Sequence, residues 1–183
     1  MGRRRLATLL VMFTLSSPAS ALAASHRDCR DAHVRPKRSN THAIAASTLC
    51  LINSMRRAHG LPVLRSSRIL ESIAIGQTHD MLLGHYFGDN SLSGLSPFAR
   101  VLASRYGRGG RRRGLLVAQN IAWATGREAT PANIVRLWMQ SPPHRAILLT
   151  KRLRSIGVGV EVGSPEGRRT SFAGVYTVEL AAP

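Results

Sequence analysis

Aromatic residues, acidic residues and cysteines are all scarce in this chain. Phe, Trp and Tyr make up 5% of its 183 residues, which leaves few rings on which nucleic-acid bases stack. The sequence also contains no internal repeat, P-loop, GxSxG motif or CxxC pair. Nothing in it therefore indicates a nucleotide-binding loop, an α/β-hydrolase nucleophile or a dithiol redox site. Hydrophobic residues still reach 44%, enough for one folded domain with its own core.

The shortage of acidic residues makes the chain strongly basic. Nine Asp and Glu residues stand against 26 Lys and Arg residues, a formal net charge of +17. A field of that sign attracts polyanions such as nucleic acids, anionic lipid surfaces and acidic cell-envelope polymers. The most basic segment, residues 108–114, is rich in glycine and has no interleaved aromatic rings, so it does not predict a specific nucleic-acid site. A solubilising, arginine-rich surface without a polyanionic partner is the alternative interpretation.

The first 23 residues have the features of a secretory signal peptide. Arg3–Arg5 form a basic start, residues 6–15 form a short apolar core, and Ala21-Leu22-Ala23 is a cleavage site. The apolar run is too short to hold the chain in a membrane, and no later segment reaches spanning length. We therefore predict a secreted, soluble protein that is extracellular or associated with the cell envelope. Without the three leader arginines, 23 basic residues stand against 9 acidic ones, a net charge of +14.

Only two cysteines, Cys29 and Cys50, are present, and both follow the leader. In an oxidising compartment such a pair is expected to form a disulfide. The bridge would join a polar, basic lead-in, residues 24–40, to the first helix. Closing a loop of this length contributes about 3 kcal/mol to stability. Two free thiols are the alternative.

Helical spacing of apolar residues dominates the first part of the domain, and strand alternation dominates its end. Helices are predicted over residues 41–59, 67–84 and 97–107 and from 131 onward, and strands over 115–123, 156–162 and 172–180. This order predicts an α+β fold, with helices packed on an antiparallel sheet, over residues 41–183.

The last predicted helix is followed by the densest group of unusual residues. One apolar face of the helix consists of Ile134, Val135, Trp138 and Met139. Pro142 and Pro143 are expected to end it, and His144 comes next. Two roles for His144 stay open: it bonds free carbonyls at the helix end, or it works as a base or ligand in a site. Ser141 and His144 are not a nucleophile pair on spacing alone, because no third group that would orient the histidine is evident.

Several short motifs occur in an order that resembles a known family. They are Cys50-Leu-Ile-Asn53, Arg56, Gly60-Leu-Pro-Val-Leu64, His79-Asp-Met81, Tyr86-Phe87, Ser96-Pro97-Phe98, Arg100, Gln119-Asn-Ile-Ala122, Trp138-Met-Gln-Ser-Pro-Pro-His-Arg145 and Ile156-Gly-Val-Gly159. From about Leu49 to Leu180 the chain resembles bacterial CAP-superfamily domains, the SCP-like relatives of cysteine-rich secretory and plant pathogenesis-related proteins. The resemblance implies an α-β-α sandwich, a secreted product, and a cleft of His and Glu side chains that in some members binds a divalent metal.

Two residues depart from the family pattern in the implied cleft. Asp89 stands where bacterial members usually have a histidine, and Gln119 stands where they usually have a glutamate. Gln is not a general base and its amide is a poor zinc ligand. With His144, the implied cleft has one imidazole and one carboxylate, fewer ligands than the three or four that proteins usually supply to zinc. His79 and His85 lie six positions apart, on different faces of a helix, so their spacing does not complete a site. We predict no resident cofactor and no dedicated metal site, and weak zinc binding stays open.

The resulting hypothesis is a secreted binding module of the CAP type; enzymatic activity stays open but is less favoured than binding. Its cleft would hydrogen-bond a polar ligand through His144, Gln119, Asn120 and Asp89, and its basic surface would bind an anionic envelope polymer, a lipid surface or a host surface. We expect a monomer with no specific nucleic-acid partner. Two alternatives rest on activities proposed for the family: a hydrolase acting on protein or peptidoglycan with His144 as its base, and a lipid or sterol carrier. The identity of the ligand does not follow from the sequence.

Overall fold

A computed structural model describes residues 29–109, 114–167 and 172–183. The predicted leader and most of the basic segment 108–114 lie outside these residues. The helices are α2 (Thr41–Ala58), α3 (Arg68–Leu83), α4 (Pro97–Ala103), α5 (Arg105–Gly109), the 3₁₀ turn η1 (Gly126–Ala129), α6 (Pro131–Gln140) and α7 (Pro142–Leu148). The strands are β1 (Arg65–Ser66), β2 (Leu116–Thr125), β3 (Ser155–Val162) and β4 (Ala173–Ala182). Among the described helices, none has both the length and the apolar character that crossing a membrane requires.

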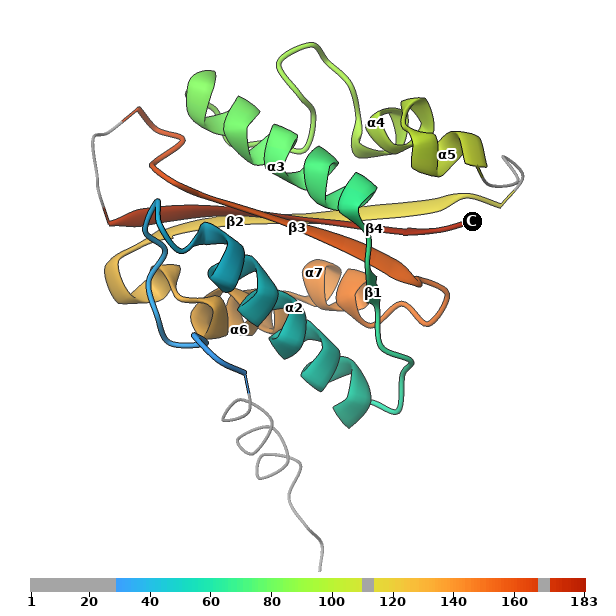
Figure 1. Ribbon diagram of the computed structural model, residues 1–183, viewed down its shortest axis with the longest axis horizontal. Coiled ribbons are helices and arrows are strands. Elements are labelled where there is room, and N and C mark those ends of the chain that lie inside the picture. The colour runs from blue at the N-terminus through green and yellow to red at the C-terminus, as the bar shows by residue number, and fades with distance from the viewer. Residues whose placement is uncertain (1–28, 110–113, 168–171) are drawn as a thin grey trace, which may run out of the picture.

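Helices cover both faces of one central sheet, as the sequence predicts. The four strands follow the order β1-β3-β4-β2. β4 pairs antiparallel with both β2 and β3, and the two-residue β1 adds a short parallel edge to β3. In Figure 1, α3, α4 and α5 lie above the sheet, and α2, α6 and α7 lie below it. All ten residues of β4 are buried, because the strand is central and has helices on both sides.

The larger hydrophobic core lies between the sheet and the layer of α2 and α6. It joins the buried faces of these helices to alternate residues of β3 and β4, among them Leu51, Ile52, Trp138, Val158 and Val178. On the opposite face, α3 lies directly against β3. A Cβ added at Gly157 would fall 2.0 Å from the backbone of Leu70, and one at Gly159 would fall 2.5 Å from that of Ala74. These two glycines therefore permit the close approach of helix and strand.

Local structure departs from the sequence predictions at two places. The helix predicted over 97–107 is divided at Ser104 into α4 and α5. Pro142 and Pro143 do not only end α6: they occupy the first turn of a further helix, α7, which contains His144. A proline is well tolerated in the first turn of a helix, because its missing N–H has no partner there.

The disulfide predicted between Cys29 and Cys50 is present and joins the lead-in to α2. The same lead-in is tied to the start of α6, since the backbone N–H of Ala132 donates to the carbonyl of Ala32 at 2.9 Å. The Cys29→Ser/Cys50→Ser variant is expected to lose about 3 kcal/mol of unfolding free energy, because its unfolded chain is no longer constrained. Denaturant unfolding of both proteins measures this loss. Equal stabilities would show that the bridge does not restrict the unfolded chain.

Candidate functional site

A series of polar contacts connects the loop between α3 and α4 to the middle of the sheet. Gln119 of β2 lies at its centre and is 8% exposed. Gln119 Nε2 donates to Asp89 Oδ1 at 3.1 Å, and Gln119 Oε1 accepts from Arg100 Nη2 at 2.5 Å. Arg100, which comes from α4, also donates through Nη1 to the carbonyl oxygens of Asp89 and Leu95 at 3.0 and 2.8 Å. Both ends of the Gln119 amide are therefore engaged.

Glu179 lies beside Gln119 on the neighbouring strand β4, in register with it. Its side chain is 0% exposed, and its Oε2 lies 3.9 Å from Arg100 Nη2. Neither carboxyl oxygen has a hydrogen-bond partner among the described residues. Burial raises the pKa of Glu179 to about 8, although the positive charge of Arg100 opposes this rise. The carboxyl is consequently mostly protonated at neutral pH.

Two side chains of α3 hold the loop that carries Asp89. Asp80 Oδ2 accepts from the backbone N–H of Leu92 at 2.6 Å. One turn earlier, Gln77 Nε2 donates to the carbonyl of Gly88 at 2.9 Å. Residues three apart lie on the same face of a helix, so both contacts point to the same side. The loop is thereby fixed at both flanks of Asp89.

The other two predicted site residues, Asn120 and His144, lie on the opposite face of the sheet. Asn120 Nδ2 donates to the backbone carbonyl of His144 at 3.0 Å. His144 is half-buried, and its ring nitrogen Nδ1 lies 2.7 Å from Ser141 Oγ. Since Gln119 and Asn120 are consecutive in a strand, their side chains point to opposite faces. The expectation of one cleft lined by all four residues is corrected accordingly: the structure forms two separate pairs.

Comparisons with known proteins identify the fold. The family model described as the cysteine-rich secretory protein family, CAP, matches residues 49–179. The chain belongs to the CAP family. It is 30% identical over 151 residues to the YkwD protein of Bacillus subtilis (strain 168), and the match covers 78% of this chain and 55% of that protein. The CAP domain thus spans about half the length of this curated relative.

Solved structures of extracellular and outer-surface proteins share the same fold. An extracellular SCP-domain protein of Bacillus anthracis superposes with a TM-score of 0.59 at 22% identity, over 81% of this chain and 44% of that one. An outer surface protein of Borrelia burgdorferi superposes with a TM-score of 0.57 at 17% identity, over 73% of this chain and 87% of that one. At these identities the likeness establishes the CAP fold alone.

The residues that this CAP domain places around Gln119 do not suit a zinc ion. Zinc prefers imidazole, thiolate and carboxylate ligands. Asp89 and Glu179 bring two carboxyl groups to this cluster, but Gln119 is bonded at both ends of its amide, and the guanidinium of Arg100, itself a cation, lies beside Gln119 and Glu179. Among the described residues, no group of three or more His, Cys, Asp and Glu side chains is arranged to hold a metal ion. The predicted donors Asp89 and His144 are on different faces and cannot share one ion.

Ser141 and His144 of the CAP domain are within hydrogen-bond distance of each other, which spacing alone did not establish. A serine nucleophile also needs a group that orients the other ring nitrogen of its histidine. Within the described part of the chain, nothing is hydrogen-bonded to His144 Nε2. Ser141 immediately precedes α7, and His144 lies in its first turn. Ser141 makes no side-chain capping bond to the backbone of α7, so its described side-chain contact is the one to His144.

Arg100 and Glu179 complete the cluster around Gln119, and sequence reasoning did not select either as a site residue. A signal for Glu179 was present: it is the only charged residue between Thr170 and Pro183, within a strongly apolar strand. A lone carboxyl in such a strand is either exposed at an edge or buried in a polar cluster. Arg100 had a weaker signal: it is one of the motif residues that carry the family resemblance, but an arginine in a short helix is ordinarily solvated.

Proposed function

We propose that this CAP protein is exported and acts as a binding module for anionic cell-envelope polymers through its basic surface. The observation that carries the proposal is the excess of unpaired arginines. Among the described residues most arginines have no carboxyl group within 4 Å; Arg100 lies beside Glu179, and Arg136 is paired with Glu128. In the described part of the chain most arginines are thus without a carboxylate partner, and an excess of basic residues attracts polyanions.

The contacts around Gln119 do not support a catalytic role. Gln119 and Arg100 are not general bases, and Asp89 Oδ1 accepts from Gln119. His144 lies on the other face with Ser141 and with no orienting partner among the described residues. These contacts favour a structural role for the residues that replace the family's cleft ligands.

Binding of the purified protein to a soluble anionic envelope polymer, at low and at high salt, tests the proposal. Attraction between exposed charges should weaken sharply as salt increases, because the Debye length falls to about 3 Å at 1 M. We expect tight, salt-sensitive binding that is the same in wild type and in His144→Ala. Binding that resists salt and is lost in His144→Ala would favour a ligand held at His144 and would contradict the proposal.

The altered cluster leads to a prediction about zinc. Wild type is expected to bind zinc weakly at most, and Asp89→His/Gln119→Glu should raise the affinity at least about tenfold, because it supplies an imidazole and a carboxylate beside Glu179. Calorimetric titration with zinc measures both. Adding His144→Ala to the double variant is the matched control and should leave the gain intact, since His144 lies across the sheet. Tight zinc binding by wild type at this cluster would refute the prediction.

A second candidate function, lipid binding, is favoured by one segment of exposed apolar side chains. Between the end of α3 and the start of α4, large hydrophobic residues are 46–65% exposed, namely Leu83, Phe87, Leu92, Leu95 and Phe98. Exposed apolar side chains that lie close together mark interaction sites. Sedimentation with vesicles of uncharged lipid separates the two candidates. Binding there, independent of salt, would support lipid recognition by this segment, and its absence would leave the polymer as the ligand.

A further inference from the structure

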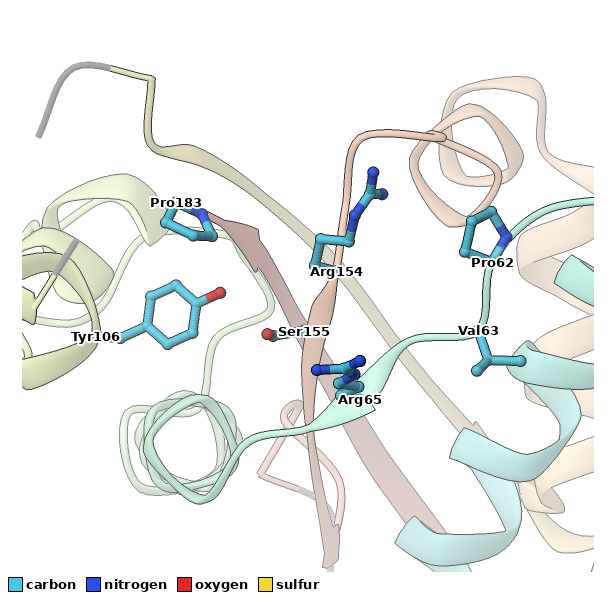
Figure 2. A pocket seen from close by; sticks show the side chains of 7 residues that line it. All are labelled: Pro62, Val63, Arg65, Tyr106, Arg154, Ser155 and Pro183. Carbon is cyan, nitrogen blue, oxygen red and sulfur yellow. The ribbon is translucent and has the colours of Figure 1, made fainter. Parts of the chain in front are cut away.

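A pocket lined by residues outside the clusters discussed so far lies at the end of the sheet where β1 and β3 begin. It has a volume of about 740 Å³, which is within the range of small-ligand sites. Its polar lining consists of Arg65, Arg154, Ser155 and Tyr106. Figure 2 shows Tyr106 on the side of the pocket nearest Ser155, and the Arg65 and Arg154 side chains extending in different directions from the adjoining strand ends.

The sheet fixes the backbone of both arginines. Arg65 pairs with Ser155 in the β1–β3 ladder, and its N–H donates to the Arg154 carbonyl at 2.9 Å. The N–H of Arg154 donates in turn to the carbonyl of Ala181 at 3.2 Å. The pocket is thus built on strand ends and not on a loose loop, which reduces the entropy lost when a ligand binds.

Positive charge in this pocket is not compensated. Neither Arg65 nor Arg154 lies in an ion pair with a carboxylate of the described residues. Arg154 uses Nη1 on the backbone carbonyls of Lys151 and Leu153, and its Nε and Nη2 remain available. Arg154 also lies close enough to the buried Arg56 for its charge to lower the pKa of that guanidinium, after the larger effect of burial. A bound anion would relieve the repulsion among these cations.

We propose that this pocket binds a phosphate group of a phosphodiester-linked envelope polymer. Each guanidinium group offers a planar pair of N–H donors that suits a phosphate oxyanion, and the Ser155 and Tyr106 hydroxyl groups line the same pocket. Pro62, Val63 and Pro183 supply apolar surface in the same pocket, against which the carbon skeleton between phosphates packs. This inference rests on the proposed function. It names the chemical class of the polymer and the part of the protein that binds it.

Calorimetric titration with a synthetic glycerol-phosphate oligomer tests the inference. Arg65→Ala/Arg154→Ala should reduce the affinity about ten- to a hundredfold, because hydrogen bonds to charged groups are strong. Arg65→Lys keeps the charge but loses the planar fork, so it should cost about threefold to tenfold. Tyr106→Phe removes one hydroxyl and should weaken binding by a smaller factor. Thermal melting of each variant confirms that it is folded.

Arg38→Ala/Arg127→Ala is the matched control, because it removes the same charge at the other end of the sheet. Arg38 is near Pro36, which lies against Gly174 at the start of β4. Arg127 follows the end of β2 that pairs with Ala173, the first residue of β4. Both therefore lie at the end of the sheet opposite the pocket. We expect this control to lower affinity by no more than about twofold at moderate salt. An oligogalacturonate of the same length should bind more weakly and should not distinguish the two double variants.

The outcomes separate the inference from the proposed function. Equal losses in the pocket variant and the control would overturn the phosphate site, while the general polymer-binding proposal would stand. Failure of wild type to bind any anionic polymer would overturn both. Equally tight, pocket-dependent binding of a single-stranded DNA oligomer would identify a nucleic-acid ligand and overturn the assignment to an envelope polymer.

Discussion

Replacing Glu179 with glutamine is expected to stabilise the protein, and the gain should increase between about pH 5 and pH 8. Glu179 is fully buried, neither of its oxygens is hydrogen-bonded within the described residues, and burial raises its pKa from 4.5 to about 8. In the unfolded chain the same carboxyl ionises in water near its ordinary pKa. Glutamine has the shape of the protonated acid and ionises in neither state.

The direction of the effect follows from proton binding. Between the unfolded pKa of 4.5 and the folded pKa of about 8, the folded protein holds a proton that the unfolded chain releases. Wild-type stability therefore falls as pH rises through this interval and stops falling above it. One pKa unit corresponds to about 1.4 kcal/mol, so the full loss is on the order of 5 kcal/mol. Glu179→Gln removes this loss.

Urea unfolding from pH 4 to pH 9 measures the prediction for wild type and Glu179→Gln. Glu128→Gln is the control, because its side chain is 60% exposed and pairs with Arg136 at the surface. The control should differ from wild type by no more than about 1 kcal/mol. If Glu179→Gln is instead less stable than wild type at pH 8, the carboxylate is ionised and stabilised by Arg100, and the attribution to burial is wrong.

Replacing Arg56 with methionine is expected to lower the unfolding free energy by about 3–5 kcal/mol. Arg56 is 0% exposed. It donates through Nε to the carbonyl of Pro62 at 2.8 Å, and through Nη1 to those of Leu148 and Thr150 at 2.7 and 3.1 Å. These carbonyls belong to the segment after α2 and the segment at the end of α7. Methionine fills a similar space but leaves three acceptors without their donor.

Denaturant unfolding of Arg56→Met beside Arg57→Met measures this effect at neighbouring positions. Arg57 is exposed and makes a single side-chain contact, to Ser54 Oγ at 3.0 Å, so its replacement should change stability by about 0.5 kcal/mol at most. Arg56→Lys keeps the charge but cannot reach all three carbonyls, and it should fall between the two. Equal stabilities of the two methionine variants would show that water replaces the guanidinium at no cost.

Much of the fold was predictable from sequence because it depends on local periodicity. The alternation of Ile156, Val158 and Val160 requires a strand with one face on the core. The 3.6-residue spacing in α3 and α6 requires helices with one buried face. The predicted export signal and the presence of only two cysteines also predicted the disulfide, because neither inference depends on how the layers pack. The positions of Pro142 and Pro143 were less informative, since proline both ends one helix and starts the next.

The sequence by itself determined the α+β layers, the Cys29–Cys50 bridge, the basic charge and the replacement of two cleft residues. Tertiary structure alone decided which polar residues meet. Gln119 and Asn120 are adjacent in sequence, but the pleat of β2 directs their side chains to opposite faces of the sheet. Gln119 bonds Asp89 and Arg100 on one face, and Asn120 bonds the carbonyl of His144 on the other. Strand register brought Glu179 beside Gln119, and burial gave that carboxyl its raised pKa. Such contacts join residues far apart in the chain, so their energies depend on packing that no local pattern encodes.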